Sequence, residues 1–131
     1  MASRQRPLSP HLQVYRWQVQ MVTSILHRAT GVVLSVGALL IAAAIVALLG
    51  GPQAWDWVRA AAGSPFGLVF LFLWVWTFSF HLLNGIRHLV QDVGLACTLP
   101  ALVASSWIAL IGSVVITLAL FGYAAMRGGL L

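Results

Sequence analysis

The sequence has very few charged residues. Its 131 residues include no lysine and no glutamate, and the charged residues that remain, seven arginines and two aspartates, make up 7% of the chain. A soluble domain carries about a quarter of its residues charged. The shortage of charge therefore excludes a soluble globular protein and a disordered tail, and the 61% of hydrophobic residues indicates a membrane protein.

Acidic residues are too few to balance the arginines, and the net charge is +5. A positive net charge is a common sign of a nucleic-acid partner. In a chain this apolar, isolated arginines are more typical of membrane topology signals. We therefore expect no nucleic-acid partner and a surface in contact with membrane lipid.

Cysteine is almost absent, since Cys97 stands alone. One cysteine excludes an internal disulfide and also an all-cysteine iron–sulfur cluster, which needs about four thiolates. No CxxCH sequence is present for covalent haem attachment. Any redox cofactor bound here must use other ligands.

Long uncharged runs predict an all-α fold with three transmembrane helices in one membrane-anchor domain, residues 1–131. The clearest run, Val32 to Leu49, has eighteen residues without a charge, close to the roughly 20 needed to cross the hydrocarbon core. The predicted spans are residues 24–49, 66–92 and 101–124. Residues 50–65 are expected to form a short interfacial loop. Three glycines are expected to permit close helix approach: Gly37, Gly112 and Gly122.

The arginines predict the orientation of the chain. Residues 1–20 show neither an apolar core after a short basic stretch nor a small-residue cleavage site, so we expect no signal peptide. Two arginines, Arg59 and Arg127, fall on one side of the predicted membrane, and five fall on the other: Arg4, Arg6, Arg16, Arg28 and Arg87. The positive-inside tendency then places the N-terminal segment, residues 1–20, in the cytoplasm.

The second span ends in a polar cluster. His81, Gly85, His88 and Asp92 follow at i, i+4, i+7 and i+11, which places them on one helical face. A histidine inside a membrane span needs a partner, and haem iron suits a neutral imidazole. Gly85 would leave room for a flat macrocycle beside His81. The alternative is that His81 only hydrogen-bonds a neighbouring helix.

The two histidines of this cluster cannot ligate the same iron, because seven residues separate them by about 10 Å along the helix axis. We assign the axial bond to His81. His88, which lies next to Arg87, is left as a candidate for a haem propionate contact or a proton relay.

A second polar face opens the first span. Ser24, His27, Arg28 and Gly31 follow at i, i+3, i+4 and i+7. A quinone head needs hydrogen-bond donors at its carbonyls and a proton source within an apolar slot, which a serine, an arginine and a histidine supply. Helix capping and headgroup anchoring are the alternative explanation.

Two stretches in this order resemble a known family. Residues 6–15 (RPLSPHLQVY) with residues 24–31 (SILHRATG), and then residues 81–88 (HLLNGIRH) closing at Asp92, are similar to the signatures of the larger cytochrome b membrane-anchor subunit of succinate dehydrogenase, respiratory complex II. The resemblance and its three-span layout cover essentially the whole chain.

The resemblance implies a haem b held between this chain and a second small anchor subunit, with one axial histidine from each. It implies His81 as the haem iron ligand, Ser24 and Arg28 as ubiquinone contacts, and His27 close to a haem propionate. Arg28 and His88 are further candidates for the propionate vicinity, and Gly85 for haem packing. The other implied partners are an iron–sulfur subunit and a flavoprotein subunit.

On this interpretation the chain performs no succinate chemistry of its own. It anchors the soluble subunits, ligates haem and forms part of the quinone site in the respiratory chain and tricarboxylic acid cycle. A bacterial inner membrane is favoured over a mitochondrial one. Three alternatives stay open: a fumarate reductase anchor, a self-contained cytochrome in which His27 and His81 clamp the haem, and a non-redox accessory subunit that relays protons.

Overall fold

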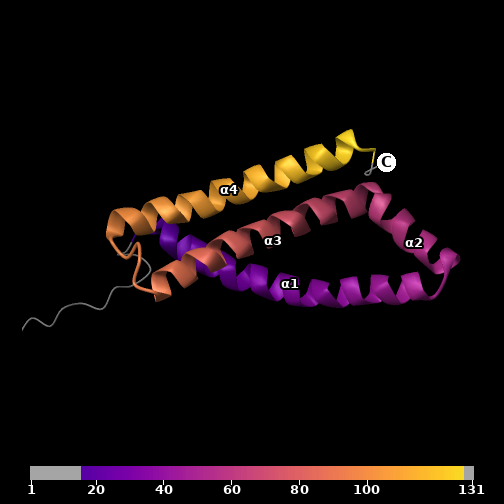
Figure 1. Ribbon diagram of the computed structural model, residues 1–131, viewed down its shortest axis with the longest axis horizontal. Coiled ribbons are helices and arrows are strands. Elements are labelled where there is room, and N and C mark those ends of the chain that lie inside the picture. Colours follow the sequence, from indigo (N-terminus) through magenta and orange to yellow (C-terminus); the bar gives the residue numbers. More distant parts are fainter. Residues whose placement is uncertain (1–15, 129–131) are drawn as a thin grey trace, which may run out of the picture.

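The computed structural model describes residues 16–128, which form four α-helices (Figure 1). Their bounds are α1 Val19–Leu49, α2 Pro52–Gly63, α3 Pro65–Asp92 and α4 Leu99–Met126. Three of the four, α1, α3 and α4, are long and apolar enough to cross a membrane. The predicted all-α fold with three transmembrane helices is confirmed.

The helices extend beyond the predicted spans at several ends. The first begins at Val19 rather than at residue 24, and the last runs from Leu99 to Met126 rather than from 101 to 124. At the start of α1, the added residues include Gln20 and Thr23, which are compatible with a helix that leaves the hydrocarbon core for the interface. Arg4, Arg6 and the motif at residues 6–15 lie outside the described residues.

The connection between the first two spans is largely a helix, so the prediction of a loop over residues 50–65 was wrong. Only Gly50 and Gly51 separate α1 from α2, and Gly51 has a φ of +102°, which glycine adopts readily. Pro52 then starts α2, where its fixed φ suits the first helical turn. The alanine-rich stretch that follows favours helix, and the turn signals before it obscured this in the sequence.

A tight corner joins α2 to α3. The hydroxyl of Ser64 donates to the carbonyl of Ala61 at 2.7 Å and accepts from the backbone N–H of Gly67 at 3.1 Å, which caps the start of α3. The α-carbon of Gly67 lies against the carbonyls of Ala61 and Ala62, where a β-carbon would collide with backbone. The corner therefore fixes the direction in which α2 leaves α3.

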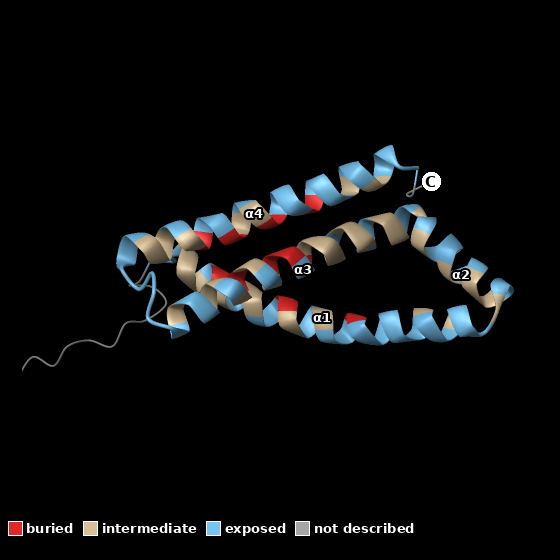
Figure 2. Ribbon diagram, in the orientation of Figure 1, coloured by how far each residue is buried: buried red, intermediate tan, exposed pale blue. Residues whose placement is uncertain are grey.

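Small and polar side chains form the interior. α3 packs against both α1 and α4, and Figure 2 shows buried positions on the facing sides of these helices. Phe80 and Ala109 are the buried apolar residues in the described range, whereas the buried polar ones are more numerous: Thr23, Thr30, Thr77, Ser79, Asn84, Ser106, Ser113 and Thr117. Such an interior is typical of membrane helices, which pack through small residues while their apolar side chains face lipid.

Two of the three predicted glycines lie at close helix contacts. A β-carbon on Gly37 of α1 would overlap the indole of Trp74 on α3, and one on Gly112 of α4 would lie 3.1 Å from Leu83. The third, Gly122, has open space around it, so the expectation of a close approach there was wrong.

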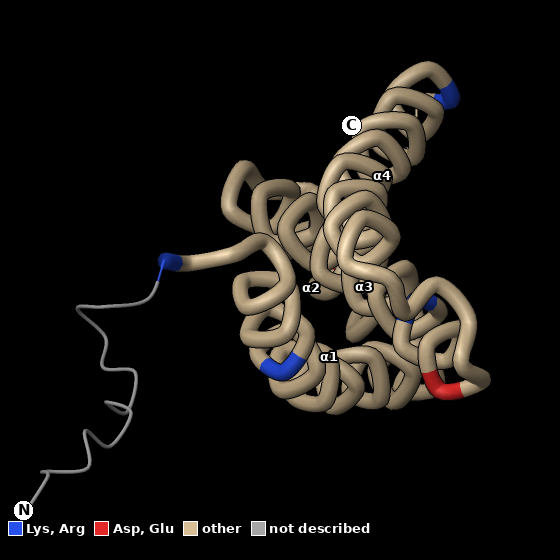
Figure 3. The backbone as a smooth tube through the Cα atoms, turned by 90° about the vertical axis from the view of Figure 1, so that its left-hand side faces the viewer, with Lys and Arg blue, Asp and Glu red and all other residues tan. Residues whose placement is uncertain are grey.

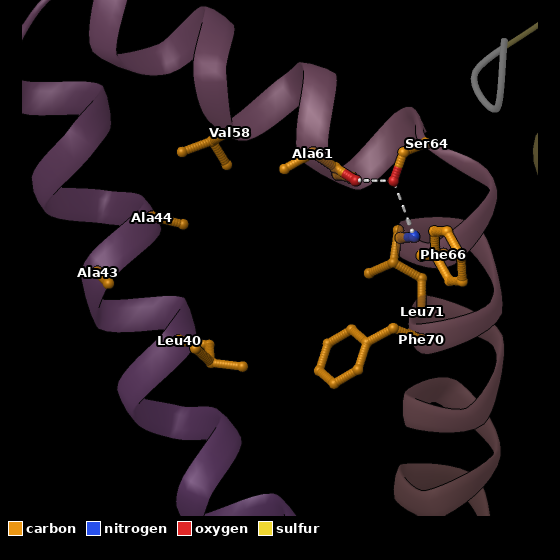
Figure 4. Close-up of a pocket in the computed structure, with 11 residues that line it drawn as sticks. Leu40, Ala43, Ala44, Val58, Ala61, Ser64, Phe66, Phe70 and Leu71 are labelled. Carbon is orange, nitrogen blue, oxygen red and sulfur yellow. Dashed lines mark hydrogen bonds between the residues drawn. The ribbon is translucent and has the colours of Figure 1, made fainter.

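An apolar cavity of about 600 Å³ lies between α1, α2 and α3, beyond the contact of Gly37 with Trp74. Figure 4 shows the side chains that face it from the three helices, with the Ser64 cap at its edge. Alanines and larger apolar residues line most of it: Leu40, Ala43, Ala44, Val58, Ala61, Ala62, Phe66, Phe70 and Leu71. None of the predicted site residues lines this cavity.

Candidate functional site

The predicted site residues meet at the opposite end from this cavity. α1 and α4 begin at that end and α3 finishes there (Figure 1). The antiparallel course of α1 and α3 brings His27 of the first polar face beside His81 and His88 of the second. The sequence places these faces 54 residues apart for the pair His27 and His81, and the fold unites them.

Three imidazole rings form the centre of the cluster. The rings of His27 and His81 stack with 4.0 Å between their centroids and an interplanar angle of 13°. The ring of His88 is tilted by 52° against His27, with centroids 5.2 Å apart. No group of three or more metal-ligating side chains among residues 16–128 is arranged to hold a bare metal ion.

One nitrogen of His81 is held by α1. Its Nδ1 lies 3.1 Å from the backbone carbonyl oxygen of His27 and 3.1 Å from the hydroxyl of Thr30. A carbonyl can only accept, so Nδ1 carries the proton and donates it. In the neutral imidazole the other nitrogen, Nε2, then keeps its lone pair, and it has no hydrogen-bond partner within the described part of the chain.

Two glycines make room for this arrangement. A β-carbon on Gly31 would lie 3.1 Å from Cε1 of His81, and one on Gly85 would lie 3.7 Å from Cε1 of His27. Each helix therefore offers a glycine to the imidazole of the other. The sequence suggested that Gly85 makes space for a macrocycle, and in the structure the neighbour at that position is the ring of His27.

The first turns of α1 present Ser24 and Arg28 toward the outside of the chain. Ser24 is half-buried and Arg28 is exposed. The Nε of Arg28 lies 3.5 Å from the backbone carbonyl of Ser24, a long hydrogen bond. The Ser24 hydroxyl has no partner among residues 16–128, so both side chains retain donors for a ligand.

Arg87 belongs to a different face of α3 from the histidines. Its Nε donates to the hydroxyl of Ser105 on α4 at 3.0 Å, and Nη1 lies 3.5 Å from Oδ1 of Asn84. Its neighbour His88 turns instead toward His27 on α1. Adjacent positions in the sequence therefore serve two helix contacts, and no carboxylate in the described range pairs with Arg87.

Some buried polar atoms at this end have no partner in the described range. They are Nδ1 of His27, Nδ2 of the fully buried Asn84, and Oε1 of Gln20. An unpaired polar atom away from water costs about 1–3 kcal/mol. These atoms lie inside the chain at the histidine end, so this end carries the cost of unpaired polar groups within its own packing.

Comparison with known proteins gives the family. The model of the succinate dehydrogenase/fumarate reductase transmembrane subunit matches residues 2–120. The chain belongs to this family. It is 41% identical to the succinate dehydrogenase cytochrome b556 subunit of Paracoccus denitrificans over 85% of this chain and 85% of the relative.

Mitochondrial and other bacterial relatives give the same picture. The mitochondrial succinate dehydrogenase cytochrome b560 subunit of Sus scrofa is 38% identical over 92% of this chain and 71% of the relative. The cytochrome b556 subunit of Rickettsia bellii (strain RML369-C) is 36% identical over 88% of this chain and 90% of its own length. The predicted resemblance to cytochrome b subunits of succinate dehydrogenase is confirmed.

Within this family member, sequence reasoning missed Thr30 as part of the site. A readable signal was present, because Thr23, Thr30 and Gly37 recur every seven residues along α1, and all three are buried. A small-residue stripe at this spacing marks the face of a membrane helix that packs on a neighbour. It predicts a helix contact for Thr30, although not the identity of the imidazole it meets.

Proposed function

We propose that this chain is the membrane-anchor cytochrome b subunit of a succinate:ubiquinone oxidoreductase, with His81 as an axial ligand of haem b. Family membership gives the setting, namely a membrane subunit of succinate dehydrogenase or fumarate reductase. The observation that carries the proposal is the state of His81, whose Nδ1 donates to the His27 carbonyl while Nε2 keeps its lone pair.

The residues present fit a haem group. An iron-ligating histidine typically donates its second ring N–H to a carbonyl or carboxylate, which fixes the ring and its tautomer. The cytochrome names of the relatives also imply haem in those proteins. When bound, haem b supplies a one-electron carrier. His81 would hold the iron, and Gly85 would pack near the haem macrocycle. His27, Arg28 and His88 would face the haem propionates.

The fit calls for a second protein ligand from outside the chain. Within residues 16–128, His27 is the imidazole stacked on His81, and it lies face to face with it at 4.0 Å, which leaves no space for a macrocycle between the rings. This observation disfavours the self-contained cytochrome. A second small anchor subunit supplies the other axial histidine in our proposal, and an iron–sulfur subunit and a flavoprotein complete the complex.

Ser24 and Arg28 are proposed to bind ubiquinone. Both lie near the start of α1 with donors directed to a ligand, a hydroxyl and a guanidinium. They would hold the quinone carbonyls, and Arg28 would add positive charge where negative charge develops during reduction. His27, between Ser24 and Arg28 in the same turn and in ring contact with His81 and His88, would stabilise propionate charge or pass a proton.

The arginine distribution supports a cytoplasmic N-terminus in a bacterial inner membrane. Arg28 and Arg87 belong to the histidine end, whereas Arg59 on α2 and Arg127 after α4 belong to the other. Figure 3 shows that few positions along the backbone are charged, since almost all of the tube is drawn in the colour of the other residues. The quinone would then be reduced near the cytoplasmic face, where the soluble subunits dock.

The test uses the complex purified in mild detergent with its partner subunits. His81→Ala should abolish or strongly perturb the low-spin haem spectrum, measured as a reduced-minus-oxidised difference. The matched control is His88→Ala, two helical turns after His81 on the same helix, and it should keep low-spin haem. A flavoprotein and a cluster-bearing protein should co-purify with wild type. An unchanged spectrum in His81→Ala would refute the ligand assignment, and a complex without any haem would favour the accessory-subunit alternative.

A further inference from the structure

Thr30 contacts the proposed haem ligand, and the proposed function gives it no role. It is 4% exposed in α1, and its hydroxyl lies 3.1 Å from Nδ1 of His81 on α3. Buried hydroxyls in membrane helices usually satisfy themselves on their own helix, and Thr30 does so as well. The contact with His81 is an additional interaction between helices.

The direction of this hydrogen bond follows from the neighbouring groups. The Thr30 hydroxyl has one proton, and carbonyls of its own helix accept it, with Oγ1 2.8 Å from the Leu26 oxygen and 2.9 Å from the His27 oxygen. Toward His81 the hydroxyl oxygen is therefore an acceptor. Two acceptors, Thr30 Oγ1 and the His27 carbonyl, share the single N–H of His81.

Two acceptors on one N–H have a chemical effect on the opposite side of the ring. They draw the Nδ1 proton outward and increase the electron density at Nε2, which makes that nitrogen a stronger donor to a metal ion. They also fix the rotation of the ring. Because both acceptors come from one turn of α1, the packing of α1 on α3 determines where the Nε2 lone pair points.

Gly31 completes the arrangement. A β-carbon at this position would lie 3.1 Å from Cε1 of His81, tighter than ordinary van der Waals contact. The carbon Cε1 stands between the two ring nitrogens, so a side chain here would push the ring away from its acceptors. Thr30 and Gly31 therefore act on His81 together, one by attraction and one by leaving space.

We propose that Thr30 and Gly31 are positioning residues, which orient and polarise the His81 imidazole so that Nε2 is presented to iron in one direction. This inference rests on the proposed function, because it concerns the same ligand. It extends that function by assigning the control of the haem iron's redox equilibrium to α1, the helix that also carries Ser24 and Arg28.

The decisive variant is Thr30→Val in the purified complex, which keeps the side-chain shape and removes the hydroxyl. Haem should still bind, since His81 and the His27 carbonyl remain. The weaker pull on Nδ1–H should make Nε2 a poorer donor to ferric iron. We expect the ferric/ferrous equilibrium to shift about tenfold toward the reduced form, equivalent to about 59 mV for one electron, with a shifted low-spin ferric EPR signal.

Matched variants separate positioning from packing. Thr23→Val removes a buried hydroxyl from the same face of α1, where it bonds only the Gln20 carbonyl at 3.1 Å, and should leave the potential unchanged. Thr30→Ser, unlike Thr30→Val, keeps the hydroxyl and should show the wild-type haem potential. Gly31→Ala should perturb the low-spin spectrum, whereas Gly122→Ala, with open space around it, should not.

The outcomes distinguish this inference from the function on which it rests. A wild-type potential and EPR signal in Thr30→Val, together with a changed spectrum in His81→Ala, would overturn the inference and leave the proposed function standing. An equal shift in Thr23→Val would also overturn it, because packing alone would then explain the effect. An unchanged spectrum in His81→Ala would overturn the proposed function first.

Discussion

The two ends of the helix bundle differ in how their helices pack. At the histidine end, polar groups of α1, α3 and α4 contact one another directly, as in the contacts of His81 with Thr30 and of Arg87 with Ser105. At the α2 end, α1, α2 and α3 line an open apolar pocket of about 600 Å³. Specific polar contacts therefore order the histidine end, where we propose the chemistry, whereas apolar side chains leave open space at the other end.

The contact between Gly37 and Trp74 divides these two ends, and breaking it should have the largest effect. In Gly37→Ala the new β-carbon would overlap the indole ring, and overpacking of this kind costs about 1–3 kcal/mol or more. We expect a lower thermal unfolding temperature for the detergent-solubilised complex and disturbed haem binding as well, because α1 must withdraw from α3.

The control for this prediction is Gly122→Ala on α4, where an added β-carbon meets nothing within 4 Å. It should leave the unfolding temperature unchanged within error. If Gly37→Ala were as stable as Gly122→Ala, the division of the bundle at Trp74 would be wrong.

The next effect should be confined to the histidine end. A hydrogen bond to a neutral group contributes about 0.5–1.5 kcal/mol, and one from a charged donor more. Ser24→Ala should therefore slow quinone reduction roughly tenfold, and Arg28→Ala should slow it further. Succinate oxidation with an artificial acceptor that bypasses the quinone should stay near normal in both variants.

Two variants away from the proposed site serve as controls for this pair. Ser35→Ala removes an exposed hydroxyl of α1 that bonds the Gly31 carbonyl at 2.9 Å, and Arg59→Ala removes an exposed charge from α2. Both should reduce quinone at the wild-type rate. Equal losses in the two assays for Ser24→Ala or Arg28→Ala would indicate that these residues hold the complex together instead.

The smallest effect is expected at the α2 end. Ala44→Leu directs a larger side chain into the cavity, and cavity filling commonly contributes about 0.5–2 kcal/mol of stability. The rate of quinone reduction should change less than about twofold and the haem spectrum should stay the same. The reason is that the contact between Gly37 and Trp74 separates the cavity from the histidine end. Ala42→Leu, on the same helix but outside the cavity lining, is the control. A large change in haem potential in Ala44→Leu would show that the two ends are coupled.

The fold was largely predictable because length and lack of charge determine whether a segment can cross a membrane. α2 was not, because its Gly-Gly-Pro start and its Trp and Asp residues have the composition of an interfacial loop. Helical spacing predicted that Ser24, His27 and Arg28 share one face of the first span, while their roles came from the family resemblance and stay a proposal. Which of these side chains contact one another could not be predicted, because that depends on the relative position of α1 and α3 along their common axis.

Thr30 and Arg87 show this limit in particular. The period of seven from Thr23 through Thr30 to Gly37 predicts a contact face but no partner. Arg87 stands beside His88 in the sequence, which suggested one shared environment, yet its Nε bonds Ser105 on the opposite neighbour. Consecutive residues on a helix point about 100° apart, so adjacency in sequence places them on different faces.

The internal hydrogen bonding of the hydroxyls has a consequence for biogenesis. Ser106, Ser113 and Thr117 of α4 each donate to a carbonyl of their own helix, so they bring little polar cost when this span enters the bilayer by itself. α3 differs, because Arg87, in the last turns of this helix, donates to the hydroxyl of Ser105 on α4 at 3.0 Å. We therefore expect this hydrogen bond between α3 and α4 to form only after both spans have entered the bilayer.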